Sequence, residues 1–305
     1  MLVTTKKLLM TARARHYAVP AMNVNNLEAV RAIISAAEKM RSPVILQTSE
    51  GAIEYAGIEY LAAIIRVAAH GKIPVAMHLD HGKDIRYVQL ALAHGYTSVM
   101  IDGSAFPYAK NVVLTKSVVK MAHAKGVSVE AEIGALRGIE DFVSVEEKDA
   151  HLTNPDEAVR FARDTKCDAL AIAIGTSHGA YKFRGKTHLD LDRLKKIARL
   201  IKIPLVLHGA SGVREDLVEI AERHGATLGA VRGVLDQDIQ AAIKLGVAKI
   251  NIDTDLRIAF TAGIRESVDD LPKVIDSRKL LERSTLLMRE VAMRKMKLFR
   301  SAGRM

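Results

Sequence analysis

The 305-residue chain has no tryptophan, and only 4% of its residues are aromatic. Because 49% of its residues are hydrophobic, we expect a large core built from aliphatic side chains. The single cysteine, Cys167, excludes an intrachain disulfide and fits a reducing compartment. No apolar run reaches membrane-spanning length, and the first residues lack the apolar segment of a signal peptide. These absences predict a soluble, cytoplasmic protein that does not bind a membrane.

Acidic residues are outnumbered, with 35 Asp and Glu against 45 Lys and Arg, for a formal net charge of +10. This excess favours an anionic partner such as a phosphorylated metabolite or a nucleic acid. The basic residues are scattered except for a dense run from Arg289 to Arg304, which we interpret as a solvated helix face. Aromatic residues do not alternate with the basic ones as base stacking requires, so we do not expect nucleic-acid binding.

Eight short apolar segments alternate with helical patterns along the chain. The predicted strands cover residues 17–23, 43–48, 74–82, 97–102, 127–133, 168–174, 204–207 and 247–250. Such alternation is typical of an α/β protein with a parallel sheet and right-handed crossovers. Eight units at this length predict a (β/α)8 TIM barrel with additional C-terminal helices, as a single domain over 1–305 whose helical extension covers about 256–305. An open doubly wound sheet is the alternative, although no strand is followed by a Gly-rich dinucleotide fingerprint or a phosphate-loop Gly-Lys-Ser/Thr.

Two segments are less regular than the rest. Arg137 to Asn154 is long, polar and rich in acidic residues, which predicts a mobile loop at an active site. Residues 225–236 interrupt the region between the seventh and eighth strands and are interpreted as an insertion.

Titratable residues gather where the predicted strands end. The third strand ends in His78, Asp80 and His81, and the sixth and seventh strands are followed by His178 and His208. In a barrel all these ends meet on one face. Three imidazoles with a fourth position open are typical of a catalytic zinc site, with three unrelated loop histidines as the alternative.

Carboxylates occur at the same strand ends. Asp80 is suited either to move a proton to and from a metal-polarised substrate or to orient a histidine. Asp102 and Glu132 can form a second metal position or hydrogen-bond to the ligands. Glu130, two residues before Glu132, is expected either near the site or as a buried partner of a basic group.

Two loops have the composition of phosphate sites. Gly209-Ala-Ser211-Gly212 precedes a predicted helix, whose N-terminal amides can hold an anion. Asn251 to Thr254 follows the eighth strand, and barrels often bind phosphate with the loops after strands seven and eight. Ordinary turns and helix caps are the alternative.

Together these segments resemble the class II, metal-dependent fructose-1,6-bisphosphate aldolases along the whole chain. The matching motifs are His78-Leu-Asp-His-Gly82, Ser98-Val-Met-Ile-Asp102, Val129-Glu-Ala-Glu-Ile-Gly134, Gly175-Thr-Ser-His-Gly179, Leu207-His-Gly-Ala-Ser211 and Lys249-Ile-Asn-Ile-Asp-Thr-Asp255.

The resemblance implies a role for each matching residue. His81, His178 and His208 resemble the catalytic Zn²⁺ ligands, Asp80 the proton donor, and Asp102 and Glu132 the residues of a second divalent-metal site, with Glu132 also a candidate catalytic residue. The residues that resemble substrate contacts are Ser49, Gly179, Gly209, Ala210, Ser211, Asn251, Ile252, Asp253, Thr254 and Arg278, the last reaching a neighbouring subunit.

The implied activity is reversible aldol cleavage of fructose 1,6-bisphosphate to dihydroxyacetone phosphate and glyceraldehyde 3-phosphate. Zinc acts as the Lewis acid, a monovalent cation (Na⁺ or K⁺) accompanies the substrate phosphate, and the chain forms a homodimer or homotetramer. Asp253 resembles the fructose-specific form. The alternatives are tagatose-1,6-bisphosphate cleavage and a non-catalytic sugar-phosphate-binding barrel.

Overall fold

The computed structural model describes the chain except for residues 135–136, 141–142, 146–151, 179–188 and 230–232. Within strands β6, β7 and β9, only the backbone is described.

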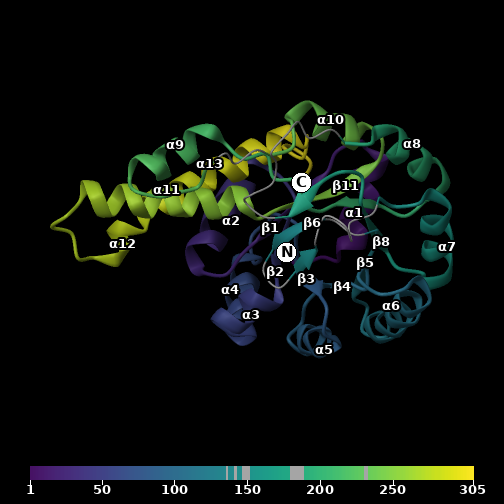
Figure 1. The fold of residues 1–305 in the computed structure, drawn as a ribbon. Coiled ribbons are helices and arrows are strands. Elements are labelled where there is room, and N and C mark those ends of the chain that lie inside the picture. The colour runs from purple at the N-terminus through teal and green to yellow at the C-terminus, as the bar shows by residue number, and fades with distance from the viewer. Residues whose placement is uncertain (135–136, 141–142, 146–151, 179–188, 230–232) are drawn as a thin grey trace.

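Eight parallel strands close into a barrel, as predicted from the sequence (Figure 1). They are β1 Val19–Asn23, β2 Val44–Thr48, β3 Val75–Gly82, β4 Ser98–Ile101, β5 Ser128–Ile133, β8 Ala169–Ile172, β10 Leu205–Leu207 and β11 Val247–Ile252. Closure results from β1 pairing with β2 on one side and with β11 on the other. The fold is therefore a (β/α)8 TIM barrel, and the open doubly wound sheet is excluded.

Helices surround the barrel and continue beyond its last strand. They are α1 Thr5–Ala14, α2 Leu27–Met40, α3 Glu50–Ala56, α4 Ile58–Ala68, α5 Ile85–Ala93, α6 Tyr108–His123, α7 Pro155–Thr165, α8 Leu191–Leu200, α9 Glu215–Arg223, α10 Asp236–Lys244, α11 Thr254–Asp270, α12 Ser277–Leu280 and α13 Glu282–Leu298. Local signals set their ends: Asn26 caps α2 by accepting from the Ala29 amide at 2.9 Å, and α2 ends at left-handed Arg41. None of the helices in the described part of the chain combines the length and the apolar character that a bilayer crossing requires.

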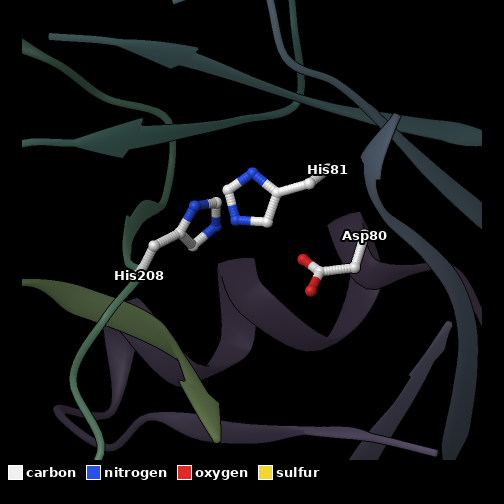
Figure 2. Close-up of side chains that lie close together, drawn as sticks. All are labelled: Asp80, His81 and His208. Carbon is white, nitrogen blue, oxygen red and sulfur yellow. The ribbon is translucent and has the colours of Figure 1, made fainter. Parts of the chain in front are cut away.

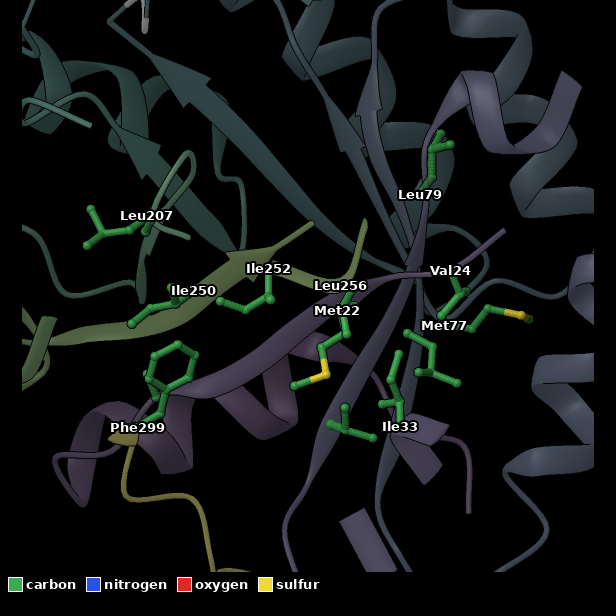
Figure 3. Close-up of a cluster of buried hydrophobic side chains, with 14 of the residues drawn as sticks. Met22, Val24, Ile33, Met77, Leu79, Leu207, Ile250, Ile252, Leu256 and Phe299 are labelled. Atoms are coloured by element: carbon green, nitrogen blue, oxygen red, sulfur yellow. The ribbon is translucent and has the colours of Figure 1, made fainter. Parts of the chain in front are cut away.

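The hydrophobic core has two parts, one outside the barrel and one inside it. The outer part fills the space between strands and helices and includes Met22, Leu79, Ile250 and Phe299 (Figure 3). The inner part fills the lumen near the start of the strands, where α1 packs against mostly small residues. These lumen residues are Val19, Ala21, Ile45, Ala76, Ala169, Ala171, Val206 and Ala248. The apolar lower lumen leaves the carboxyl end of the barrel for polar side chains.

Helices α11, α12 and α13 form an arm. Helices α11 and α13 pack against each other, and α12 lies at their far end, away from the barrel (Figure 1). The arm ends in exposed side chains, among them Ile275, which is 97% exposed. Its base remains attached to the barrel because α13 packs on α2 and α11 follows β11 directly.

The two segments that the sequence marks as irregular differ in the structure. The prediction that Arg137 to Asn154 is wholly a loop was wrong, because β6 Arg137–Glu140 and β7 Val143–Val145 pair antiparallel within it. Strand β6 also pairs with β9 Ser177–His178, so the segment joins the loop after β8 in a small sheet. Residues 225–236 do separate α9 from α10 without a described helix or strand before Asp236, and residues 230–232 lie outside the described part.

Candidate metal centre

The carboxyl ends of the barrel strands bring the predicted histidines and carboxylates into one buried cluster. Strand β3 supplies Asp80 and His81, β5 supplies Glu132, and His208 follows β10. All four side chains are buried, with exposures of 7% or less. Residues that are up to 128 positions apart thus meet on one face of the barrel, as the fold predicts.

The His81 backbone departs from regular strand geometry. Its φ of 47° lies in the left-handed region, and the pairing register with β4 shifts between Leu79 and Gly82. This conformation costs a non-glycine residue about 1–2 kcal/mol. Gly82 follows because a Cβ there would lie 2.6 Å from the Met100 carbonyl oxygen. The kink breaks the alternation of side chains, so His81 and neighbouring Asp80 serve the same site.

His81 and His208 face each other across this site (Figure 2). Their ring centroids lie 4.5 Å apart at an interplanar angle of 63°. One ligand atom each from Asp80, His81 and His208 lies within 4.8 Å of the others. A second trio, His81, Asp102 and Glu132, meets the same criterion.

Carboxylates hold both histidine rings. The His81 Nδ1 lies 3.0 Å from Asp102 Oδ2, and the His208 Nδ1 lies 3.0 Å from Glu132 Oε2. Burial opposes protonation of each ring, but the surrounding carboxylates outweigh it. They raise the pKa of His81 well above its usual value and that of His208 to about 9. The cluster therefore attracts positive charge.

The Glu130 side chain contacts the second ring nitrogen of His208, Nε2. Its Oε1 accepts from His208 Nε2 at 2.8 Å and from Lys249 Nζ at 3.0 Å. Burial alone would raise the pKa of Glu130, but Lys249 and the histidines hold it below its usual range. Of the two roles expected for Glu130, the buried partner of a basic group is the one observed, and Lys249 is that group.

His78 lies earlier in β3 than Asp80 and His81, nearer the start of the strand. Its Nδ1 lies 2.8 Å from Ser98 Oγ, and complete burial followed by the charge of Lys249 lowers its pKa to about 3. His78 is therefore neutral, unlike His81 and His208, whose pKa values the carboxylates raise.

Three amide side chains hold Asp80. Asn23 and Gln47 donate to its Oδ2 at 3.0 and 2.9 Å, and Asn251 donates to its Oδ1 at 2.9 Å. Burial would raise the pKa of Asp80, but His81 and Lys249 outweigh burial and lower it. The three amides thus fix the Asp80 side chain, and the nearby cations favour its ionised form. Gln47 was not predicted from the sequence, although a polar residue within an otherwise apolar strand is a usable signal.

A cavity of about 570 Å³ opens where β1, β2 and β11 end, and it is linked to the cluster through Asn23, which lines it and donates to Asp80. Its lining includes Asn23, Ser49, Asp253 and Arg257. Ser49 caps α3 by accepting from the Ala52 amide at 3.2 Å. Asp253 pairs with Arg257, one helical turn later, with 2.8 Å between Oδ2 and Nε. Arg257 was missed by sequence reasoning, and its i,i+4 spacing from Asp253 at a helix start could have identified it.

The two loops expected to hold phosphate lie at the same end of the barrel. Gly209 adopts a φ of 59°, and Ala210 and Ser211 are buried. Thr254 begins α11 directly after Asp253. Ile252, in contrast, packs its side chain into the outer core, so its backbone alone is available to a ligand (Figure 3).

Of the remaining predicted residues, Arg278 lies away from this cluster, and two others fall partly or wholly outside the described residues. The backbone of His178 lies in β9, but its side chain and the whole of Gly179 are outside the described residues. Arg278 lies on α12 at the tip of the arm, with its side chain 89% exposed and paired to Asp276 at 2.9 Å.

The donor set fits a divalent metal ion. Imidazole nitrogens and carboxylate oxygens are ligands that zinc accepts, and the raised pKa values reflect an excess of negative charge that a cation would offset. The described members are Asp80, His81, His208, Asp102 and Glu132.

Comparison with known proteins agrees with this geometry. The family model "Fructose-bisphosphate aldolase class-II" matches residues 3–304. A fructose-bisphosphate aldolase from Thermus caldophilus is 51% identical over 304 residues, and one from Helicobacter pylori is 45% identical over 306, each match covering 100% of both chains. The crystal structure of the YdjI aldolase from Escherichia coli superposes with a TM-score of 0.80 at 32% identity, covering 100% of this chain and 99% of the other. The chain therefore belongs to the class II fructose-bisphosphate aldolase family, whose members are aldehyde-lyases.

Proposed function

We propose that the chain catalyses zinc-dependent, reversible cleavage of fructose 1,6-bisphosphate to dihydroxyacetone phosphate and glyceraldehyde 3-phosphate. The observation that carries the proposal is the convergence of an amide-held Asp80 with His81 and His208 at the barrel mouth. Family membership and the names of the relatives support it.

His81, His178 and His208 would hold the zinc ion, with Asp102 and Glu132 available to a second divalent ion. Bound zinc supplies Lewis-acid polarisation of the substrate carbonyl. Asp102 orients His81 through its hydrogen bond to Nδ1, and Glu130 orients His208 through Nε2. The carboxylates thereby hold both imidazole rings in orientation.

Asp80 is the general base for cleavage. It takes the proton from the hydroxyl group whose carbon becomes the aldehyde, and the three amide donors keep it ionised and in place. In condensation the same proton returns to the aldehyde oxygen. Glu132, 3.0 Å from His208, is the candidate for moving the carbon-bound proton of dihydroxyacetone phosphate.

The two substrate phosphates would be bound by separate sets of contacts. Gly179, Gly209 to Ser211 and Asn251 to Thr254 are the proposed contacts for the dihydroxyacetone phosphate part, with a Na⁺ or K⁺ ion beside its phosphate. Ser49, which lines the cavity with Asp253, is proposed for the glyceraldehyde 3-phosphate part. A carboxylate at Asp253 supports preference for the fructose over the tagatose epimer.

The exposed position of Arg278 supports a homodimer or homotetramer in which it reaches the second phosphate in a neighbouring subunit. We further propose that the chain acts in the cytoplasm as a single domain. The buried, lone Cys167 is compatible with a reducing compartment.

Fructose 1,6-bisphosphate cleavage, measured by a coupled assay before and after EDTA treatment, tests the function. We expect activity to be lost to the chelator and restored by added Zn²⁺. Full activity after verified metal removal would contradict the zinc mechanism. A larger kcat/KM for tagatose 1,6-bisphosphate would reassign the substrate, and absence of cleavage of either sugar with zinc bound would indicate a binding role.

A further inference from the structure

The end of β3 combines a strained backbone with a proposed metal ligand. His81 has a left-handed φ of 47°, and Gly82 to Asp84 then lead into α5. A non-glycine residue keeps this conformation only where surrounding contacts hold it. The contacts that fix the backbone here therefore affect the orientation of the His81 side chain.

Glu50 provides such a contact from a different part of the chain. It is the first residue of α3, and its side chain is buried although it carries a carboxylate. Its Oε1 accepts from the backbone amide of Lys83 at 2.8 Å and from that of Asp84 at 2.9 Å. One carboxylate oxygen thus holds the two amides that directly follow the His81-Gly82 kink.

We propose that Glu50 is a positioning residue that keeps the β3–α5 turn in the conformation that presents His81 to the metal. The proposal rests on the proposed function in that His81 is taken as a zinc ligand. Hydrogen bonds from amides to an ionised carboxylate are shorter and stronger than those between neutral groups. Without the carboxylate, the two amides lose their acceptor and the strained turn can relax.

The position of Glu50 also links this turn to the substrate cavity. The preceding residue, Ser49, lines the cavity and caps the same helix. A shift of the start of α3 would therefore move the Ser49 hydroxyl as well as the His81 turn. We expect loss of Glu50 to weaken both metal and substrate binding, rather than proton transfer at Asp80.

The variants Glu50→Ala, Glu50→Asp and Glu50→Gln separate this role from a general contribution to folding. Alanine removes the acceptor, and aspartate is too short to reach both amides. Glutamine retains an acceptor oxygen at the same distance and serves as the conservative rescue. Glu54→Ala is the matched control, because Glu54 lies on the same helix and contacts Tyr87 of α5 without touching the turn.

Two measurements require no turnover: hydrogen exchange at the Lys83 and Asp84 amides, and Zn²⁺ affinity by competition with a chromophoric chelator. In Glu50→Ala we expect exchange to rise at least about tenfold and Zn²⁺ affinity to fall about 10- to 100-fold. Glu50→Asp should show the same effects, and Glu50→Gln, which keeps the acceptor oxygen but not its charge, should fall between the parent and Glu50→Ala. In steady-state cleavage, KM should rise more than kcat falls.

If Glu50→Ala does not fold, Glu50→Asp carries the same comparison. Parent-like exchange and Zn²⁺ affinity in the folded alanine or aspartate variant would overturn the proposal, as would equal effects in Glu54→Ala. Because exchange and metal affinity are read without substrate, failure of the parent to cleave fructose 1,6-bisphosphate would overturn the proposed function while leaving this test intact.

Discussion

At the scale of single residues, Asp80 is the group on which the proposed chemistry depends most directly. Its carboxylate accepts from three amides and lies beside His81 and His208. We predict that Asp80→Ala lowers kcat by about 10²- to 10⁴-fold, as expected for loss of a general base. Zinc content should stay at the parent level, because the three histidines and not Asp80 are the proposed zinc ligands, and metal analysis of the purified variant would establish this. Parent-like cleavage with zinc retained would remove Asp80 from the catalytic role.

The buried pair of Glu130 and Lys249 makes a prediction about stability. Lys249 is fully buried, and its Nζ lies 2.9 Å from Glu130 Oε2. Breaking such a pair by Lys249→Met leaves Glu130 with His208 as its hydrogen-bonded partner, and it should lower the free energy of unfolding by about 3 kcal/mol. The double variant Glu130→Gln/Lys249→Met should lose less than the sum of the single variants, as measured by urea unfolding of the metal-free protein. Additive losses would show that the two groups do not stabilise each other.

Several site residues could be predicted from the sequence because strand ends converge in any parallel barrel. His81, His208, Asp80, Asp102 and Glu132 lie together as that rule requires. Contacts across the barrel were not accessible in the same way, since the register between distant strands decides them. The Asn251 amide that donates to Asp80 and the Lys249 ammonium that pairs with Glu130 belong to this second class. The predicted ligand role of His178 stays a prediction.

At the scale of elements, the arm depends on close packing of α11 on α13. A Cβ added at Gly263 would lie 2.4 Å from the Ser284 amide nitrogen, which is backbone and cannot move aside alone. We predict that Gly263→Ala costs about 3 kcal/mol of unfolding free energy by forcing the helices apart. Gly71→Ala is the control, because its Cβ meets only the flexible end of Glu38 at 3.2 Å and should change stability by about 0.5 kcal/mol or less. Equal effects on thermal unfolding would contradict the packing argument.

Hydrophobic periodicity located all eight barrel strands and the helices between them, but it missed the shortest elements. Helix α3 has seven residues, and β6 and β7 have four and three. Such lengths hold too few turns or alternations for a period to emerge. Strand β6 also depends on pairing with β9, about 40 residues later, which local sequence does not specify.

At the scale of the whole molecule, the proposed role of Arg278 predicts complementation between subunits. Asp80→Ala and Arg278→Ala should each be impaired alone. When the two variants are co-expressed, a mixed oligomer contains a site with intact Asp80 from one subunit and intact Arg278 from its neighbour. We expect cleavage activity to reappear in the mixed oligomer, isolated with two different affinity tags. If Arg278 serves its own subunit, each site in the mixture carries a substitution and activity stays low.

The pairing of the first strand with the last also has a consequence for how the protein is made. Strand β1 is translated more than 200 residues before β11, the neighbour with which it closes the barrel. On the ribosome, β1 and later β10 therefore have an unpaired edge until residues 247–252 have emerged, and exposed edges invite pairing with other chains. Contacts this distant in sequence also form slowly. Nascent chains of this enzyme should thus depend on chaperones until the final strand is complete.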